Sequence, residues 1–168
     1  MNYFELFEIP LQFEVDSKKI RPKFLALSRK FHPDFHTDQN EADQEKLMEI
    51  SAAVNKGWQV FQEPLSTLHY VLELLGKITS HENPTLSPAF LMEMMELNEL
   101  LTEGDPSQLS SMQEKISQYT IEIHEDVKDI LRKVPATTTD KEFEKIKDYY
   151  YKSKYLQRIQ ERIGQGLS

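Results

Sequence analysis

Residues 30–36, with the sequence KFHPDFH, hold the side chains with the clearest chemical potential. His32 and Asp34 could form a general acid–base pair, and His32 with His36 has the four-residue spacing of zinc ligands on a helix. Pro33 argues against the zinc site, because the residue before a proline is pushed towards an extended backbone and a helix ends there. Neither a nucleophile elbow nor a phosphate-binding glycine loop accompanies the acid–base pair. We therefore expect no enzyme, no catalytic residue, no metal site and no cofactor.

A basic amphipathic helix is predicted immediately before this stretch, with Asp16 as its N-cap. Its apolar positions follow the spacing of a buried helix face: Ile20, Phe24, Leu27 and Phe31. Pro22 lies beyond the first turn, where a proline removes a backbone hydrogen bond and clashes with the preceding turn, so we expect a late start or a kink. A short helix from about Tyr3 to Glu8 is predicted before it.

Charge is distributed unevenly along the chain, whose net charge is −8. Six of the 20 basic side chains lie within residues 17–31, which contain no acidic one. The rest of the sequence therefore has 14 basic and 28 acidic residues. A positive segment on an acidic protein favours docking to an acidic partner surface, although a merely solvated helix face has the same composition. The acidic remainder would repel phosphate groups, so we expect no nucleic-acid partner.

Two further helices are predicted in the first half of the chain. The first begins after Asp38, with Glu41 in its first turn, and stops before Pro64. The second begins at Pro64 and ends at Gly76, which suits a C-terminal cap. Residues 77–86, KITSHENPTL, are polar and without periodicity, and we interpret them as an interdomain linker.

Three helices are predicted in the second half. Ser87-Pro88 opens one that ends near Glu103 and Gly104, and Asp105-Pro106 opens a long one that ends near Pro135. Thr139 and Glu142 form a capping box for the last. A three-helix bundle follows from two long antiparallel helices and a shorter one.

Composition agrees with an all-α protein of the cytoplasm. Glycine is scarce, and Leu, Glu, Lys and Gln dominate. The chain has no cysteine, which excludes disulfides and thiolate metal sites within it. The first ten residues show neither a basic lead nor a long apolar run, so we expect no signal peptide, transit sequence or membrane partner.

The order of elements over residues 1 to about 75 resembles the J domain: a short aromatic helix, a basic helix, HPD in a loop, and an antiparallel third helix. The resemblance implies binding to a heat-shock chaperone of the DnaK/HscA type and stimulation of its ATPase. It further implies that the basic helix docks on an acidic surface of the chaperone and that the HPD aspartate contacts an arginine. The implied chaperone-binding residues are His32, Pro33, Asp34, Lys23, Arg29 and Lys30. The alternative, HPD as a mere helix-ending turn, stays open.

Residues 89–103 carry two different faces if they form a helix. At about 100° per residue, six residues fall within an arc of about 140° around the helix axis. In order of angle they are Leu91, Met95, Glu99, Met92, Glu103 and Glu96. An apolar group lies on another side and is sufficient to anchor the helix: Phe90, Met94, Leu97 and Leu101. Methionine suits an adaptable contact surface, so the mixed apolar and acidic arc is a candidate binding face. The alternative is that Leu91, Met92 and Met95 only widen the core stripe.

Three stretches together resemble the HscB family of J-type co-chaperones in iron–sulfur cluster assembly: NYFELF, NKGWQVFQEPLSTLHYVL and AFLMEMMELNELL. A general DnaJ-type chaperone is disfavoured because no glycine/phenylalanine-rich or cysteine-rich region is present. The family resemblance implies that the mixed arc binds an IscU-type scaffold protein, together with an aromatic residue of the last helix. The implied scaffold-binding residues are Leu91, Met92, Met95, Glu96, Glu99, Glu103 and Tyr155.

We therefore expect an all-α, L-shaped, two-domain protein: a J domain over residues 1–76, a linker over 77–86 and a three-helix bundle over 87–168. Tyr155 is expected on the surface, away from the stripe that contains Leu156 and Ile163. We expect a monomer in the cytoplasm. The absence of the cysteine-bearing N-terminal extension of some eukaryotic relatives favours a bacterial protein. The alternatives are a J-domain protein that delivers a different client, or a helical interaction scaffold without chaperone activity.

Overall fold

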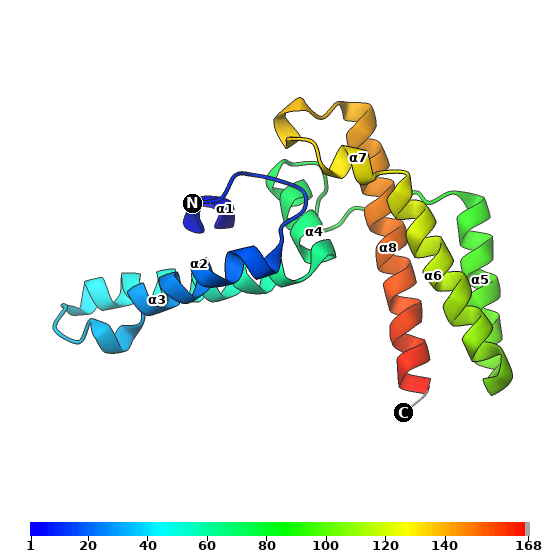
Figure 1. The fold of residues 1–168 in the computed structure, drawn as a ribbon, viewed down its shortest axis with the longest axis horizontal. Coiled ribbons are helices and arrows are strands. Elements are labelled where there is room, and N and C mark those ends of the chain that lie inside the picture. Colours follow the sequence, from blue (N-terminus) through cyan, green and yellow to red (C-terminus); the bar gives the residue numbers. More distant parts are fainter. Residues whose placement is uncertain (167–168) are drawn as a thin grey trace. The chain divides into compact units, whose positions relative to one another are not determined.

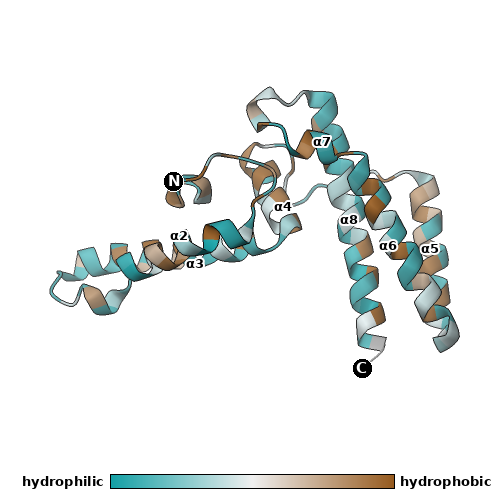
Figure 2. Ribbon diagram, in the orientation of Figure 1, coloured by the Kyte–Doolittle hydropathy of each residue, from teal (hydrophilic) through white to brown (hydrophobic). Residues whose placement is uncertain are grey.

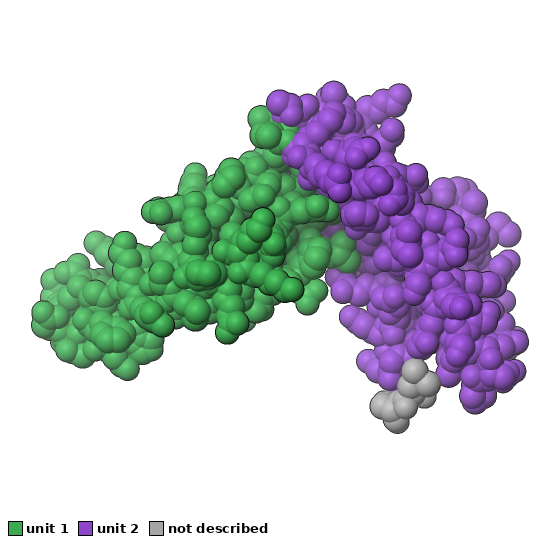
Figure 3. Space-filling view, viewed as in Figure 1, with its two compact units in different colours: residues 1–75, 134–136 green, residues 76–133, 137–168 purple. Residues whose placement is uncertain are grey.

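The computed structural model describes residues 1–166, and over that range it contains helices and turns without a strand (Figure 1). The chain forms two compact units, residues 1–75 with 134–136 and residues 76–133 with 137–168 (Figure 3). The predicted all-α, two-domain fold class is therefore confirmed. Residues 77–86, predicted as a linker, belong to the second unit.

The first unit contains α1 (Tyr3–Leu6), α2 (Ser17–Lys30), the 3-10 turn η1 (Pro33–Phe35), α3 (Glu41–Gln62) and α4 (Pro64–Leu74). A side-chain cap begins α1, α2 and α3, whereas α4 opens on Pro64 without one. Asn2, Asp16 and Asn40 each accept a hydrogen bond from the first turn of α1, α2 and α3. Such caps satisfy donors that no preceding turn can reach.

Pro22 lies inside α2. Of the late start or kink expected there, the late start is wrong. The helix begins at Ser17, directly after the Asp16 cap, and runs through the proline to Lys30. Pro22 is exposed, so the Lys18 carbonyl that loses its partner remains accessible to water. Its position on the outside of the helix explains why the proline is tolerated.

An aromatic cluster forms the core of the first unit. The Phe61 ring of α3 meets the rings of Phe4 and Phe7 edge-on, each at 5.2 Å between centroids. Gly57 allows α1 to approach α3, because a Cβ atom there would lie 2.9 Å from the ring of Phe7. Along the α2–α3 contact, Phe24 stacks on Trp58 at 4.8 Å.

The second unit contains α5 (Pro88–Glu103), the 3-10 turn η2 (Pro106–Gln108), α6 (Leu109–Glu125), α7 (Lys128–Leu131) and α8 (Asp140–Gly166). The 3-10 turn η3 (Pro135–Thr137) precedes α8, and its first two residues belong to the first unit. Ser87 caps α5, and Gly104 ends it in the left-handed conformation, φ 70°. The predicted capping box of α8 is confirmed, since the Glu142 N–H donates to the Thr139 hydroxyl and the Thr139 N–H donates to the Glu142 carboxylate.

The predicted continuous helix from Asp105 to near Pro135 is wrong, because α6 ends at Glu125 and a short α7 follows. Val127 leaves the helical conformation, with φ −123° and ψ −5°. This break shifts the register of the chain, so that Val127 and Leu131 are buried while Val134 stays exposed. Burial of the two side chains offsets the lost helical hydrogen bonds.

The core of the second unit joins α5, α6 and α8. Its buried members are Phe90, Met94, Leu97, Met112, Ile116, Leu156, Ile159 and Ile163. Figure 2 shows α5 coloured as more hydrophobic than α8 along much of its length. The α5 helix therefore carries more apolar side chains than its buried stripe alone requires.

Residues 77–86 are attached to α8 by polar contacts. The Lys147 ammonium lies 2.8 Å from one Glu82 oxygen, and the Tyr151 hydroxyl donates to the other at 3.2 Å. The hydrogen bond from Lys147 lowers the pKa of Glu82 and raises the pKa of Lys147. Burial, together with the Glu82 charge, raises the pKa of Tyr151 to about 12. The contact is consequently an ion pair at neutral pH.

Candidate functional site

The HPD residues form an ordered turn at the end of α2. His32 is extended, with ψ 129°, because Pro33 follows it. Pro33 opens η1, and the Asp34 N–H donates to Nδ1 of His32 at 3.3 Å. A ring nitrogen that accepts this bond carries no proton, so the neutral form of His32 stabilises the turn.

The carboxylate of Asp34 points into solvent and has no cationic partner when His32 is neutral. The Asp34 side chain is 85% exposed, and its nearest basic atom is Nδ1 of His32 at 3.6 Å. The backbone around Asp34 is nevertheless fixed, since the Phe35 N–H donates to the His32 carbonyl and the His36 N–H to the Pro33 carbonyl. The geometry offers a preorganised acceptor for a charge-assisted hydrogen bond.

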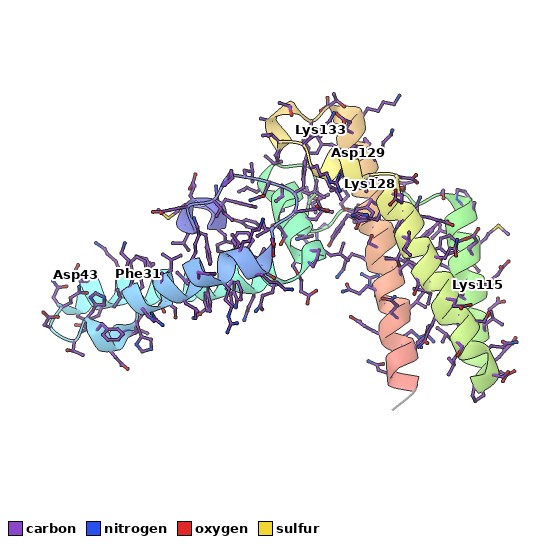
Figure 4. All side chains as sticks on the ribbon, in the orientation of Figure 1. Phe31, Asp43, Lys115, Lys128, Asp129 and Lys133 are labelled. Atoms are coloured by element: carbon purple, nitrogen blue, oxygen red, sulfur yellow. The ribbon has the colours of Figure 1, made fainter. Side chains whose placement is uncertain are left out.

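His36 organises the same turn from its other side, a role that the sequence analysis did not identify. Its Nε2 lies 2.8 Å from the Lys30 carbonyl, which can only accept, so Nε2 donates. Nδ1 then accepts from the Gln39 amide at 3.2 Å. The ring thus joins the end of α2 to the segment before α3. Figure 4 labels Phe31, the residue that follows α2, and Asp43, in the first turn of α3. The signal in the sequence was a second histidine close to a helix end.

The predicted basic residues differ in their availability. Arg29 and Lys30 are exposed in the last turn of α2. The Lys23 ammonium donates a hydrogen bond to the Glu8 carbonyl at 2.9 Å and so holds Glu8 in the left-handed conformation, φ 53°. Lys23 therefore has a local structural role in addition to the predicted one.

The residues of the mixed arc lie on one exposed side of α5. Met92 and Met95 are 63% and 59% exposed, and Leu91 is 37% exposed. The acidic members of the arc are exposed as well: Glu96, Glu99 and Glu103. The opposite stripe is buried, so the alternative that the three apolar residues only widen the core is wrong.

Tyr155 is half-buried, and its expected position on the open surface is wrong. Its ring meets Phe90 of α5 edge-on at 6.1 Å, and Phe90 also meets Tyr119 of α6 at 6.5 Å. Helix periodicity placed Tyr155 away from the buried stripe of α8, but periodicity does not show that α5 covers this position. Tyr155 thereby contacts the residue that precedes Leu91.

Five exposed apolar side chains in the first unit were not identified from the sequence. They are Met1, Leu25 of α2, Phe35 of η1, Met48 of α3 and Leu74 of α4. The Phe35 ring lies 6.0 Å from the His32 ring. For Leu25, the available signal was its position off the 20-24-27-31 stripe.

Among residues 1–166, no three side chains of His, Cys, Asp or Glu are grouped as metal ligands. Over the same residues, no helix is both long and apolar enough to span a membrane.

Residues 86–164 match the family model described as the HSCB C-terminal oligomerisation domain. A protein of Vibrio cholerae described as "Co-chaperone protein HscB homolog" is 42% identical over 102 residues, and the match spans 60% of each chain, less than two thirds of that relative. Relatives with the same description are matched nearly throughout. The Vibrio parahaemolyticus protein is 30% identical over 97% of this chain and 95% of its own, and the Shewanella woodyi protein 30% identical over 99% of each.

Two solved structures have the same fold. Chaperone HscB from Vibrio cholerae superimposes with a TM-score of 0.77 at 29% identity, covering 98% of this chain and 96% of that one. Human co-chaperone protein HscB superimposes with a TM-score of 0.82 at 26% identity, covering 98% and 81%.

Proposed function

The chain belongs to the HscB family, and we propose that it is a co-chaperone that brings an IscU-type iron–sulfur scaffold protein to a DnaK/HscA-type heat-shock chaperone. In this proposal the J domain, residues 1–76, stimulates the ATPase of the chaperone, and residues 87–168 hold the scaffold. The protein itself catalyses no reaction. ATP hydrolysis would close the chaperone on the scaffold, and transfer of the cluster to recipient proteins would follow.

The observation that carries the proposal is the exposed carboxylate of Asp34 on a hydrogen-bonded turn directly after a basic helix. A turn that only ended α2 would need neither the His32 acceptor nor the His36 bridge to hold Asp34 in place. A carboxylate on a fixed backbone loses less entropy on binding a guanidinium group than one on a mobile loop, which supports a directional contact with the chaperone. Arg29 and Lys30 lie close by along the chain and would approach an acidic surface.

The exposed side of α5 supports the second half of the proposal. Methionine and leucine side chains surrounded by glutamates suit a partner surface with an apolar patch and basic edges. Tyr155 would support this surface through Phe90 rather than through a fully exposed ring. We propose that the seven predicted residues act together: Leu91, Met92, Met95, Glu96, Glu99, Glu103 and Tyr155.

We further propose a monomer that acts in the bacterial cytoplasm without a resident cofactor. The iron–sulfur cluster would be cargo of the scaffold. The net charge of −8 agrees with protein partners better than with nucleic acid.

The test is the steady-state ATPase rate of DnaK/HscA-type chaperones, measured with this protein in the absence and presence of purified scaffold. Stimulation that rises further when scaffold is added is the expected result. Stimulation that does not respond to scaffold would indicate a different client. The absence of stimulation would leave the alternative of a helical interaction scaffold.

A further inference from the structure

The outward face of α2 is apolar at its centre. Pro22, Leu25, Ala26 and Arg29 are spaced three and four residues apart and so lie on one side of the helix. All four are exposed, and Leu25 is 41% exposed. This side faces away from the stripe of Ile20, Phe24, Leu27 and Phe31, which packs along α3. We call the centre formed by Pro22, Leu25 and Ala26 the apolar strip.

Basic side chains surround the apolar strip. α2 contains no acidic residue, and its six basic residues are all exposed: Lys18, Lys19, Arg21, Lys23, Arg29 and Lys30. None of the six pairs with a carboxylate among residues 1–166. The face leads directly into the HPD turn, because α2 ends at Lys30 and η1 begins at Pro33.

The composition of the face determines what kind of partner fits it. Exposed charges steer association and set orientation, but salt screens them and they add little affinity at physiological ionic strength. Affinity comes mainly from a desolvated apolar centre with a polar rim. Two properties of the strip favour such a centre, since Pro22 has a fixed φ angle and the small side chain of Ala26 allows close approach.

We propose that the apolar strip is the desolvated centre of the contact with the chaperone, with Leu25 as its principal side chain. The complementary surface is then apolar in its middle and carries carboxylates at its edge. This inference rests on the proposed function, because it takes the chaperone as the occupant of the face. Charge complementarity with an acidic rim and continuity with the HPD turn select that occupant.

The experiment uses the full chain and measures chaperone ATPase against its concentration at two ionic strengths. Leu25→Ala is expected to raise the half-maximal concentration about tenfold, equivalent to about 1.4 kcal/mol. Leu25→Lys is the discriminating variant, because it adds a cation to a basic face and removes the apolar contact. It too is expected to raise the half-maximal concentration, at low and at high salt. Leu25→Met, which keeps apolar area, is expected to behave like the unaltered protein.

Met48→Ala is the matched control. It removes an exposed apolar side chain, 62% exposed, from α3 of the same unit, and we expect no change beyond about twofold. Unfolding followed by Trp58 fluorescence checks that each variant is folded, since Trp58 packs against Phe24 of α2.

Two failures are distinguishable. If Leu25→Lys lowers the half-maximal concentration or leaves it unchanged, the face acts by charge alone and the inference is overturned. The proposed function still stands in that case, provided that Asp34→Asn does not stimulate the ATPase. If the unaltered protein does not stimulate the chaperone, the proposed function fails and the inference fails with it.

Discussion

Replacement of Asp34 by asparagine separates binding chemistry from folding. The substitution keeps the size of the side chain and the N–H that donates to His32, and it removes only the negative charge. The Asp34 side chain is 85% exposed, and its nearest basic atom belongs to a half-exposed His32 at 3.6 Å. Interactions between such exposed groups contribute little, so we expect the free energy of unfolding to change by less than about 0.5 kcal/mol.

The effect on the chaperone complex is expected to be much larger. A guanidinium group that is buried against Asp34 in the complex would lose its counter-charge, a change that typically costs about 2–4 kcal/mol. At about 1.4 kcal/mol per tenfold, the affinity falls roughly 30- to 700-fold. The same magnitude cannot arise from loss of fold, since the exposed side chain contributes so little to it.

The assay has two readouts on the same preparation. ATPase stimulation is expected to disappear at concentrations that saturate the unaltered protein, while scaffold affinity, measured by isothermal titration calorimetry, stays within about twofold. Equal loss of both activities would refute the assignment of two independent surfaces. Full stimulation by Asp34→Asn would refute the role of the carboxylate.

Four further predictions follow from individual contacts. Leu91→Ala with Met95→Ala should weaken scaffold binding roughly 30- to 140-fold, about 2–3 kcal/mol for two apolar contacts, and should leave ATPase stimulation without scaffold unchanged. An unchanged calorimetric affinity for the scaffold would contradict the α5 surface. Gly57→Ala should destabilise the first unit by about 1–2 kcal/mol in denaturant unfolding, because the added Cβ would lie 2.9 Å from the ring of buried Phe7. This clash outweighs the better helix propensity of alanine. A stabilised variant would show that α1 can move. The pKa of Glu82 is lowered, so its pairing with Lys147 stabilises the fold above the ordinary carboxyl pKa, and this contribution is lost as the pH falls through the lowered pKa. Glu82→Gln should therefore lower the free energy of unfolding by about 0.5 kcal/mol at pH 7 and leave it unchanged at about pH 2. An equal cost at both pH values would exclude the ion pair. Light scattering should give the 19.7 kDa mass of a monomer, and a twofold mass would contradict the monomer.

Local signals in the sequence were sufficient for most helix boundaries and for the HPD turn. Asp16, Ser87 and the Thr139–Glu142 pair each bond to backbone or side-chain groups no more than three residues away. Pro33 acts on the residue directly before it. Interactions of such short range depend on the sequence alone, so their outcome could be predicted without a fold.

The division of α5 into two faces was equally accessible from the sequence. Helix periodicity alone separated Phe90, Met94 and Leu97 from Leu91 and Met95. Whether the second group was free or covered was not decidable at that stage, because coverage depends on where α6 and α8 lie. Only the structure shows that both neighbours meet α5 on one side.

Tertiary packing decided the features for which sequence reasoning was wrong or silent. The break at Val127 exists because burial of Val127 and Leu131 outweighs continuation of the helix. Glu82 pairs with Lys147, 65 residues away, and Tyr155 packs on Phe90 of another helix. Periodicity measures angles around a single helix, whereas burial depends on which second helix arrives at each angle. The sequence by itself therefore determined where most helices begin and end and which turn carries the HPD residues. The packing of helices decided where the helix after Asp105 breaks and which side chains remain available to partners.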